Sequence, residues 1–211
     1  MVNYKTAASE AEAEQTIEKS RFIGYIKPVE TREEAESFIA EIRSRHKGAT
    51  HNVPAYVIGD NAQLQWASDD GEPSGTSGAP VLHMLVGEGL TNVVMVITRY
   101  FGGIKLGTGG LVRAYTSTAR LALDASGICQ VSELDELSFS LDYSLYGRMQ
   151  NLEQTGLFVI DDAAFTDRVS LRVHTDPENT QQLLTTLSEI TGGNCSGDAV
   201  LSKKILGKKK I

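Results

Sequence analysis

The chain has 211 residues, of which 41% are hydrophobic and 22% are charged, and its formal net charge is −7. This composition is ordinary for a folded globular chain and excludes an intrinsically disordered protein, a collagen and a pure coiled coil. The longest strongly apolar run, Val93–Ile97, is far shorter than the roughly 20 residues of a membrane-spanning helix, so we expect no membrane contact.

The cysteines and the first residues indicate the cellular setting. Residues 1–18 carry acids in place of the apolar core of a signal peptide, which predicts a cytoplasmic protein. Cys129 and Cys195 are too few for a disulfide framework and fit a reducing compartment. Four dispersed histidines and the lack of a CxxC pair offer no metal-ligand spacing, so we expect neither a metal nor a cofactor.

Charge is unevenly distributed along the chain. Residues 1–130 contain 12 basic and 15 acidic residues, residues 131–200 contain 3 and 12, and residues 201–211 contain five lysines and no acid. The acidic balance argues against nucleic-acid binding by the whole surface. The lysine-rich end either contacts phosphate backbones or acidic proteins, or is a solvated tail that offsets the acidic segment before it.

The first 70 residues predict strands and one helix. Strands are expected at residues 11–17, 19–27, 53–58 and 63–67. Between them, Thr31 and Glu34 fit a capping box in which Glu34 reaches back to the Thr31 amide, and the helix continues to about Lys47. Its buried face is expected to consist of Ala35, Phe38, Ile39 and Ile42.

Two glycine-rich segments follow, each between a predicted strand and a predicted helix. The first, residues 68–78, leads into a short helix near Ser77, and a buried strand is expected over residues 91–98. The second, residues 102–110, leads into a helix from about Gly109 to Ala125. The buried stripe of that helix is expected to contain Leu111, Tyr115, Ala119 and Ala122.

Residues 131–211 form a second pattern. Strands are expected at residues 136–143, 157–161, 168–174 and 198–202, with helices at 146–154 and 177–190. The order β-α-β-β-α-β is that of a ferredoxin-like domain. The predicted fold class is therefore α+β with two domains, residues 1–130 and residues 131–211, the second ending in the lysine-rich tail.

Ten of the 20 glycines lie between residues 71 and 110, which indicates unusual backbone angles or a close approach by a ligand. Gly102 and Gly107 have the spacing of a P-loop, but Thr108-Gly109 replaces its Lys-Ser/Thr, and the GxGxxG fingerprint is also absent. These two nucleotide-binding motifs are therefore excluded.

The second glycine-rich segment predicts an anion site. Arg99, Lys105 and Arg113 flank it, and Thr108 is a suitable N-cap for the following helix, whose free amides would attract a phosphate or a carboxylate. In the alternative interpretation the glycines only form tight turns, and the arginines pair with the acids of the first segment, Asp69, Asp70 or Glu72.

A second basic cluster contains Arg43, Arg45, His46, Lys47 and His51. It is either a binding surface or a set of cations that stabilises the C-terminus of the first helix. His51, next to a predicted strand, is the histidine most typical of a site. Tyr100 and Phe101 either stack on a base or fill the core.

Several short segments occur here in a specific combination. They are Ser20-Arg21-Phe22, Arg45-His46, His51-Asn52, residues 70–76 and, above all, the long run from Thr98 to Tyr115. This combination resembles the YigZ/Impact family, and the C-terminal β-α-β-β-α-β pattern is similar to the second domain of its bacterial YigZ branch.

The resemblance implies a fold and a function. The N-terminal domain would be α/β, like domain IV of elongation factor G and the second domain of a small-subunit ribosomal protein, and the C-terminal domain would resemble domain V of that factor. Eukaryotic Impact relatives regulate translation initiation through a starvation kinase that bacteria lack. The resemblance therefore implies a translation-related or RNA-associated protein, and it brings no catalytic residues.

We expect a non-enzymatic regulatory protein that binds RNA, the ribosome or a translation factor through a basic, glycine-rich cleft. The candidate contact residues are Arg45, His51, Asp70, Gly71, Glu72, Arg99, Tyr100, Gly102, Gly103, Lys105, Gly107, Thr108, Gly109, Gly110 and Arg113.

The alternative is an enzyme that acts on a small phosphorylated or acidic substrate. Asp70 or Glu72 would be its general base, with His51 as a further candidate, and Arg99 and Arg113 would hold the anion.

Overall fold

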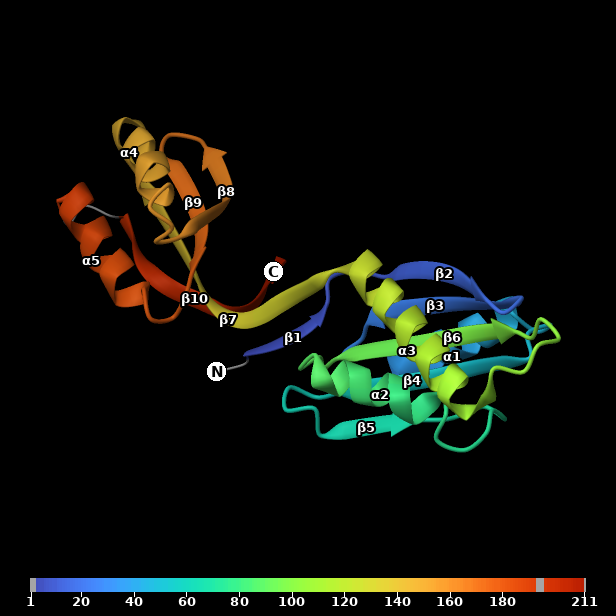
Figure 1. Cartoon of the computed structure of the whole chain (residues 1–211). Helices are drawn as coiled ribbons and strands as arrows, with labels where there is room; N and C mark the ends of the chain where they lie inside the picture. Colours follow the sequence, from blue (N-terminus) through green and yellow to red (C-terminus); the bar gives the residue numbers. More distant parts are fainter. Residues whose placement is uncertain (1–2, 193–195, 211) are drawn as a thin grey trace. The chain divides into compact units, whose positions relative to one another are not determined.

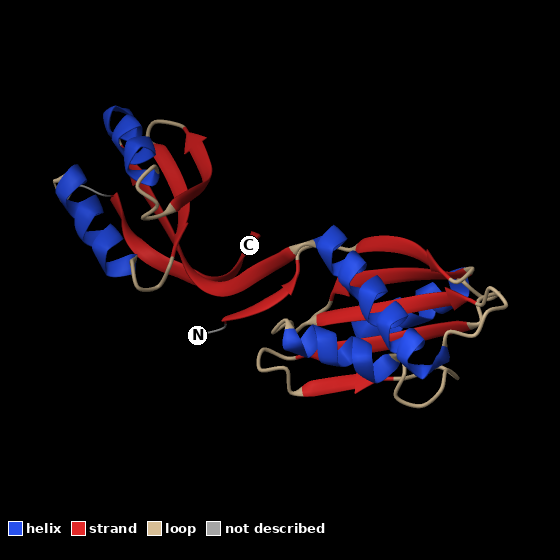
Figure 2. Cartoon of the chain, viewed as in Figure 1, coloured by secondary structure: helices blue, strands red, loops and turns tan. Residues whose placement is uncertain are grey.

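The computed structural model describes the backbone of residues 3–192 and 196–210 and the side chains of residues 3–192 (Figure 1). The chain divides into two compact units, and the division falls between Val131 and Ser132. Both units contain helices and strands (Figure 2). In the described part of the chain, no helix is both long and apolar enough to cross a membrane.

The N-terminal unit is built on one antiparallel sheet. Its strands are β2 (Ala11–Ile17), β3 (Ser20–Pro28), β4 (His51–Ile58), β5 (Leu64–Ala67) and β6 (Val93–Tyr100), in the order β2-β3-β6-β4-β5. Three helices pack on this sheet: α1 (Arg32–Arg45), α2 (Gly78–Gly87) and α3 (Gly107–Ser126).

Both faces of the central strand β6 are covered, which explains its continuous apolar run. Val93, Met95 and Ile97 pack in a core with residues of α2 and α3. Val94 and Val96 pack in a second core with residues of α1. The odd-numbered residues of β6 therefore point toward α3, and this alternation later decides which residues form the site.

Helix α1 has the predicted apolar face, since Ala35, Phe38, Ile39 and Ile42 are all buried. Its capping differs in one detail. The Glu34 amide donates to Thr31 Oγ1 at 3.2 Å, but the Glu34 carboxylate accepts from the Glu30 amide at 2.7 Å and not from Thr31. The helix ends at Arg45, two residues before the predicted end, with His46 as its C-cap.

Helix α3 corrects one prediction about the glycine-rich segment. The helix begins at Gly107 and its N-cap is Leu106, so Thr108 lies in the first turn and makes no cap. Gly107 has φ of +70°, a conformation that glycine adopts without steric cost, and it turns the chain into the helix earlier than expected. The predicted buried stripe of Leu111, Tyr115, Ala119 and Ala122 is confirmed.

The C-terminal unit has the predicted element order. It contains β7 (Ile128–Leu141), α4 (Tyr143–Glu153), β8 (Val159–Phe165), β9 (Val169–Thr175), α5 (Thr180–Thr191) and β10 (Ser196–Lys210). The sheet has five strands in the order β1-β7-β9-β8, where β1 is Asn3–Ala7, and β10 also pairs with β7. The neighbours of β7 thus include β9 and β10, as for the first strand of ferredoxin-like domains, and one core joins the sheet to both helices. The lysine-rich end lies on β10, and the side chains of its predicted phosphate contact are outside the described residues.

The sequence analysis missed the first strand. β1 (Asn3–Ala7) lies beside the beginning of β7, where Gln130 Nε2 donates to the Tyr4 carbonyl at 3.1 Å. β7 itself begins at Ile128, eight residues before the predicted strand. Tyr4, Cys129 and Val131 form a small core there, apart from the main ones.

Candidate functional site

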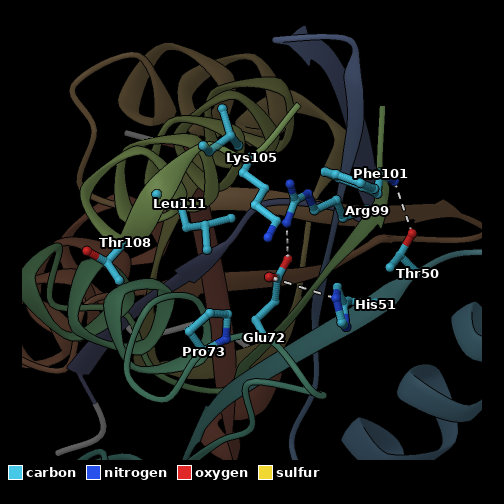
Figure 3. A pocket seen from close by; sticks show the side chains of 11 residues that line it. Thr50, His51, Glu72, Pro73, Arg99, Phe101, Lys105, Thr108 and Leu111 are labelled. Atoms are coloured by element: carbon cyan, nitrogen blue, oxygen red, sulfur yellow. Dashed lines mark hydrogen bonds and ion pairs between the residues drawn. The ribbon is translucent and has the colours of Figure 1, made fainter. Parts of the chain in front are cut away.

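A cavity of about 450 Å³ opens on the N-terminal unit where β4 begins, β6 ends and α3 begins (Figure 3). We refer to it as the first cavity. Its walls come from the two glycine-rich segments and from neighbouring strand ends. The lining residues are Thr50, His51, Glu72, Pro73, Arg99, Phe101, Lys105, Leu106, Gly107, Thr108 and Leu111.

The sheet register brings His51 and Arg99 together. They lie directly opposite each other on the antiparallel strands β4 and β6. Side chains of directly opposite residues point to the same face of a sheet. Here that face is the one covered by α3, so both side chains continue the odd-numbered row of β6 beyond its apolar part.

Glu72 is buried beside the first cavity, and its side chain is 3% exposed. Its Oε1 atom accepts from Arg99 Nη1 at 2.7 Å and from the Tyr115 hydroxyl at 2.7 Å (Figure 3 shows the Arg99 contact). Its Oε2 atom accepts no hydrogen bond within the described residues, and His51 Nε2 lies 3.8 Å from it. One carboxylate oxygen is thus satisfied inside the protein, while the other is left beside the cavity.

The neutral hydroxyl of Tyr115 donates the hydrogen bond that holds Glu72 in place. The ring is fully buried and packs edge-on against Phe22 at 5.4 Å between centroids. Burial, and then the neighbouring charge of Glu72, raise the pKa of the Tyr115 hydroxyl far above its ordinary value. The hydroxyl therefore keeps its proton at every physiological pH and can always donate to the carboxylate.

Arg99 is a buried ion-pair partner of Glu72. Its guanidinium lies 5.3 Å from the Phe22 ring centre and 5.4 Å from that of Phe101. Its Nη2 atom donates to Ser20 Oγ at 3.4 Å, and its Nε atom has no partner in the described structure. The alternative interpretation, in which the arginines pair with acids of the first glycine-rich segment, is correct for Arg99.

Lys105 and Arg113 differ from Arg99, because both are exposed and neither side chain makes an ion pair or hydrogen bond with the described residues. Lys105 lines the first cavity and also a second cavity of about 530 Å³, which Arg113 lines as well. The second cavity is formed by Ile17, Glu18, Ile104, Lys105, Leu106, Gly110, Arg113, Ala114 and Ser117. The two free cations flank the N-terminus of α3, where the first amides have no acceptor within the helix.

The acids of the first glycine-rich segment have structural partners. Asp69 Oδ1 accepts from the amides of Ser77 and Gly78 and from the Ser77 hydroxyl, and its Oδ2 accepts from the Gly75 amide. Burial alone would raise the pKa of Asp69, but these four donors outweigh it and lower the pKa. Asp69 thus holds the loop against the start of α2 as a charged acceptor.

Asp70 orients the other side of this loop. Its carboxylate accepts from the Asn52 amide at 2.7 Å and from Arg43 at 3.0 Å. Its carbonyl lies 2.7 Å from His51 Nδ1, which must be the donor because a carbonyl can only accept. In the neutral ring the lone pair therefore lies on Nε2, the atom nearest Glu72.

Apart from His51, the second basic cluster does not line the first cavity. Arg45 pairs with Glu41 at 2.7 Å and lies over the Tyr25 ring. His46 is held between the hydroxyls of Tyr25 at 2.6 Å and Tyr100 at 2.9 Å, and burial, followed by the charge of Arg45, lowers its pKa. Arg45 and Tyr100 are therefore separate from the site formed by His51 and Glu72.

The candidate glycines have different surroundings. Gly107 lines the first cavity and Gly110 the second, whereas Gly71 packs against the His51 ring and Gly102 against the Lys19 backbone. Gly103 and Gly109 line neither cavity. Of the two arginines of the enzyme hypothesis, Arg99 lines the first cavity and Arg113 the second.

The sequence analysis did not identify several residues of the site: Ser20, Thr50, Pro73, Leu106, Leu111 and Tyr115. Tyr115 carried a usable signal, because it was placed on the buried stripe of the helix and a buried tyrosine hydroxyl needs a hydrogen-bond partner. Its partner, Glu72, lies 43 residues away in the sequence.

Comparison with known proteins places these residues in a family. Residues 18–123 match the Impact N-terminal domain, and residues 139–194 match DUF1949, a domain of unknown function. The chain is 39% identical to IMPACT family member YvyE of Bacillus subtilis, over 90% of this chain and 88% of that protein. This chain belongs to the IMPACT family.

Other members of the IMPACT family match over different lengths. IMPACT family member YigZ of Escherichia coli is 40% identical over 61% of this chain and 64% of its own length. Mouse Protein IMPACT is 34% identical over 44% of this chain and 30% of its own length. A crystal structure described as that of a hypothetical protein has a TM-score of 0.61 and 31% identity, and covers 96% of this chain and 100% of its own. The resemblance to the YigZ branch is thus confirmed.

Proposed function

We propose that this IMPACT family member is a translation-related regulatory protein that binds RNA of the translation machinery at the start of α3. The translation-related part of the proposal rests on the family resemblance. The RNA part rests on the site, and a single observation carries it: Lys105, an unpaired cation, lies on the wall shared by two neighbouring cavities.

The arrangement of charge favours a polyanion over a single small anion. Lys105 and Arg113 lie on successive cavities, and unpaired α3 amides lie beside them. Successive phosphates of a nucleic-acid strand are spaced along such a path, whereas a small anion needs all its cations at one point. Glu18 at the second cavity and the overall charge of −7 keep the attraction local to this path.

The wall of the first cavity also offers a stacking surface. Phe101 is 46% exposed, which is unusual for a phenylalanine, and it lines the first cavity together with Lys105. Aromatic side chains next to basic residues are a common means of binding unpaired bases, with stacking worth about 1–3 kcal/mol per base. This combination favours single-stranded RNA over a duplex.

Ribosome co-sedimentation tests the proposal. Purified protein is mixed with ribosomes at low and high salt, as the wild type and as the Lys105→Ala/Arg113→Ala double variant. We expect association with the wild type that weakens as salt rises and is lost in the double variant.

The matched control is Lys5→Ala/Lys47→Ala, which removes the same charge from residues that line neither cavity. It should associate like the wild type. Absence of association at either salt concentration would contradict the proposal. Association that changes neither with salt nor in the Lys105→Ala/Arg113→Ala variant would also contradict it and would indicate contact with a protein surface of the ribosome.

A further inference from the structure

The first cavity also contains a hydrogen-bond acceptor, the Oε2 atom of Glu72, which neither the cations nor the stacking surface would use. The side chain is 97% buried, and Oε1 already accepts two hydrogen bonds. Oε2 accepts none within the described residues, although it lies beside the cavity with His51 (Figure 3). A charged carboxylate oxygen that faces a cavity and has no protein donor is free to accept a hydrogen bond from a ligand there.

A second acceptor faces the same point. His51 donates through Nδ1 to the Asp70 carbonyl, so the neutral ring presents its lone pair at Nε2, which is 3.8 Å from Glu72 Oε2. A ligand hydroxyl has one proton and would donate it to Glu72 Oε2, the charged acceptor of the two. A phosphate oxygen carries no proton to donate at neutral pH and would be repelled by both atoms.

The charge of Glu72 does not exclude an anionic strand from the cavity. Arg99 neutralises the carboxylate at 2.7 Å from inside the protein, and Lys105 adds a positive charge on another part of the wall. The cavity therefore combines a place for a hydroxyl donor with a place for a phosphate. In RNA these two groups are neighbours, because the 2′-hydroxyl and the 3′-phosphate are on adjacent ribose carbons.

We propose that the first cavity distinguishes RNA from DNA by accepting a ribose 2′-hydroxyl at Glu72 Oε2, with the adjoining phosphate at Lys105. This inference rests on the proposed function, since it names the sugar that the same site selects. The 2′-hydroxyl is the group by which a protein can tell RNA from DNA at one position.

Fluorescence anisotropy at low salt with three labelled hexamers tests the inference on the full-length wild-type chain. The hexamers are oligouridine, oligodeoxyuridine and 2′-O-methyl oligouridine, which carry the same base and differ at the 2′ position. A hydrogen bond to a charged group is worth about 1.5–3 kcal/mol, so we expect the RNA to bind at least about tenfold tighter than the DNA.

The methylated RNA separates donation from sugar shape. It keeps the RNA sugar geometry and the 2′ oxygen but has no proton to donate, so we expect it to bind as weakly as the DNA. Equal binding of RNA and DNA, or methylated RNA binding as tightly as RNA, would overturn the inference while leaving RNA binding itself intact. Binding of none of the three hexamers would overturn the proposed function together with the inference.

Two variants show which residue causes the preference for RNA over DNA and which residue binds the phosphate. Glu72→Gln should remove the RNA preference while DNA binding remains, because Lys105 is unchanged. Lys105→Ala should weaken RNA and DNA by the same factor and leave their ratio unchanged. Thermal unfolding shows whether Glu72→Gln is folded, and if it is not, the three wild-type hexamers still decide.

Discussion

At the residue scale, the carboxylate of Glu72 connects the second glycine-rich segment to the first. Arg99 lies at the end of β6 and Tyr115 on α3, and both donate to the same oxygen of Glu72 at 2.7 Å. Removing one donor from a buried charged group leaves the charge less compensated, and the loss exceeds that of an ordinary hydrogen bond. The trio therefore holds β6, α3 and the loop around residue 72 in place.

Replacing Tyr115 by Phe tests the strength of this connection. The variant keeps the fully buried ring but loses the hydroxyl that donates to Glu72, so we expect the free energy of unfolding to fall by about 1.5–3 kcal/mol. Urea unfolding followed by circular dichroism measures it.

The control for this variant is Tyr56→Phe. Tyr56 is also buried in the N-terminal unit, but no hydrogen bond of its hydroxyl is seen among the described residues. Its loss should change the free energy of unfolding by less than about 0.5 kcal/mol. Equal changes in the free energy of unfolding would mean that the Tyr115–Glu72 hydrogen bond adds no measurable stability.

At the element scale, both glycine-rich loops are positioned by close contacts with neighbouring elements. The loop before α2 is tied by Asp69 to four donors near the helix start. The loop before α3 packs on the turn between β2 and β3, where Ser20 Oγ accepts from the Gly102 amide at 3.1 Å. These anchors hold the walls of the first cavity in the absence of a ligand.

The anchoring by Asp69 should depend on pH. Since the pKa of its carboxyl is lower in the folded state than in the unfolded chain, its stabilisation is present above the unfolded pKa of about 3.9 and is lost as pH falls through the folded value. We expect Asp69→Asn to be about 1 kcal/mol less stable than the wild type at pH 7, with the difference shrinking below about pH 4. Urea unfolding at pH 7 and pH 3 measures it, and an undiminished difference at pH 3 would contradict the role of the charge.

The close packing of Gly102 predicts opposite effects at two glycines of one segment. A Cβ atom at Gly102 would lie 2.0 Å from the Lys19 carbonyl carbon, so Gly102→Ala should destabilise the protein by about 1–3 kcal/mol. At Gly109, in the first turn of α3, the nearest atom would be Arg113 Nη1 at 3.6 Å, so Gly109→Ala should stabilise by up to about 1 kcal/mol. Melting temperatures compare the two, and a stable Gly102→Ala would show that the loop can move away from Lys19.

At the scale of the whole molecule, the chain carries net negative charge while a few free cations remain on one unit. Residues 1–130 contain most of the basic residues, yet many of them pair with acids, as Arg21 does with Glu14 and Arg120 with Glu88. Lys105 and Arg113 are exceptions among the described side chains. We therefore expect few phosphate contacts and a modest dependence of RNA binding on salt.

The number of phosphate contacts determines the expected salt dependence of RNA binding. For single strands the slope of log K against log salt is about −0.7 for each phosphate contact, so two contacts at Lys105 and Arg113 predict a slope near −1.4. Lys105→Ala should reduce the slope by about 0.7. Anisotropy titrations at four salt concentrations measure the slope, and a slope of zero would contradict phosphate contacts at Lys105 and Arg113.

The two units have separate cores, so we expect that a substitution can destabilise the C-terminal unit without changing RNA binding by the N-terminal unit. Leu183 is fully buried in the core of the C-terminal unit, and no residue of that unit lines either cavity. Leu183→Ala should lower the free energy of unfolding of that unit by about 2–5 kcal/mol and leave the affinity for oligouridine unchanged. A parallel loss of affinity would show that the C-terminal unit takes part in binding.

Much of the fold could be predicted from local patterns. The spacing of Ala35, Phe38 and Ile42 determined the buried face of α1, and the apolar run Val93–Ile97 determined a strand covered on both sides. The order of strands and helices in residues 131–211 was enough to indicate the ferredoxin-like arrangement. Such features repeat with the period of a helix or a strand, so the sequence carries them directly.

The sequence by itself also indicated which segments would line the first cavity, since both glycine-rich segments contribute residues to its wall. Only the tertiary structure decided what each charged residue does there. Arg99 is neutralised by Glu72 while Lys105 and Arg113 stay free, and Tyr115 supplies the second donor. The physical reason is that a pairing depends on distance in space between residues 27 or 43 positions apart, and strand register and helix packing set that distance.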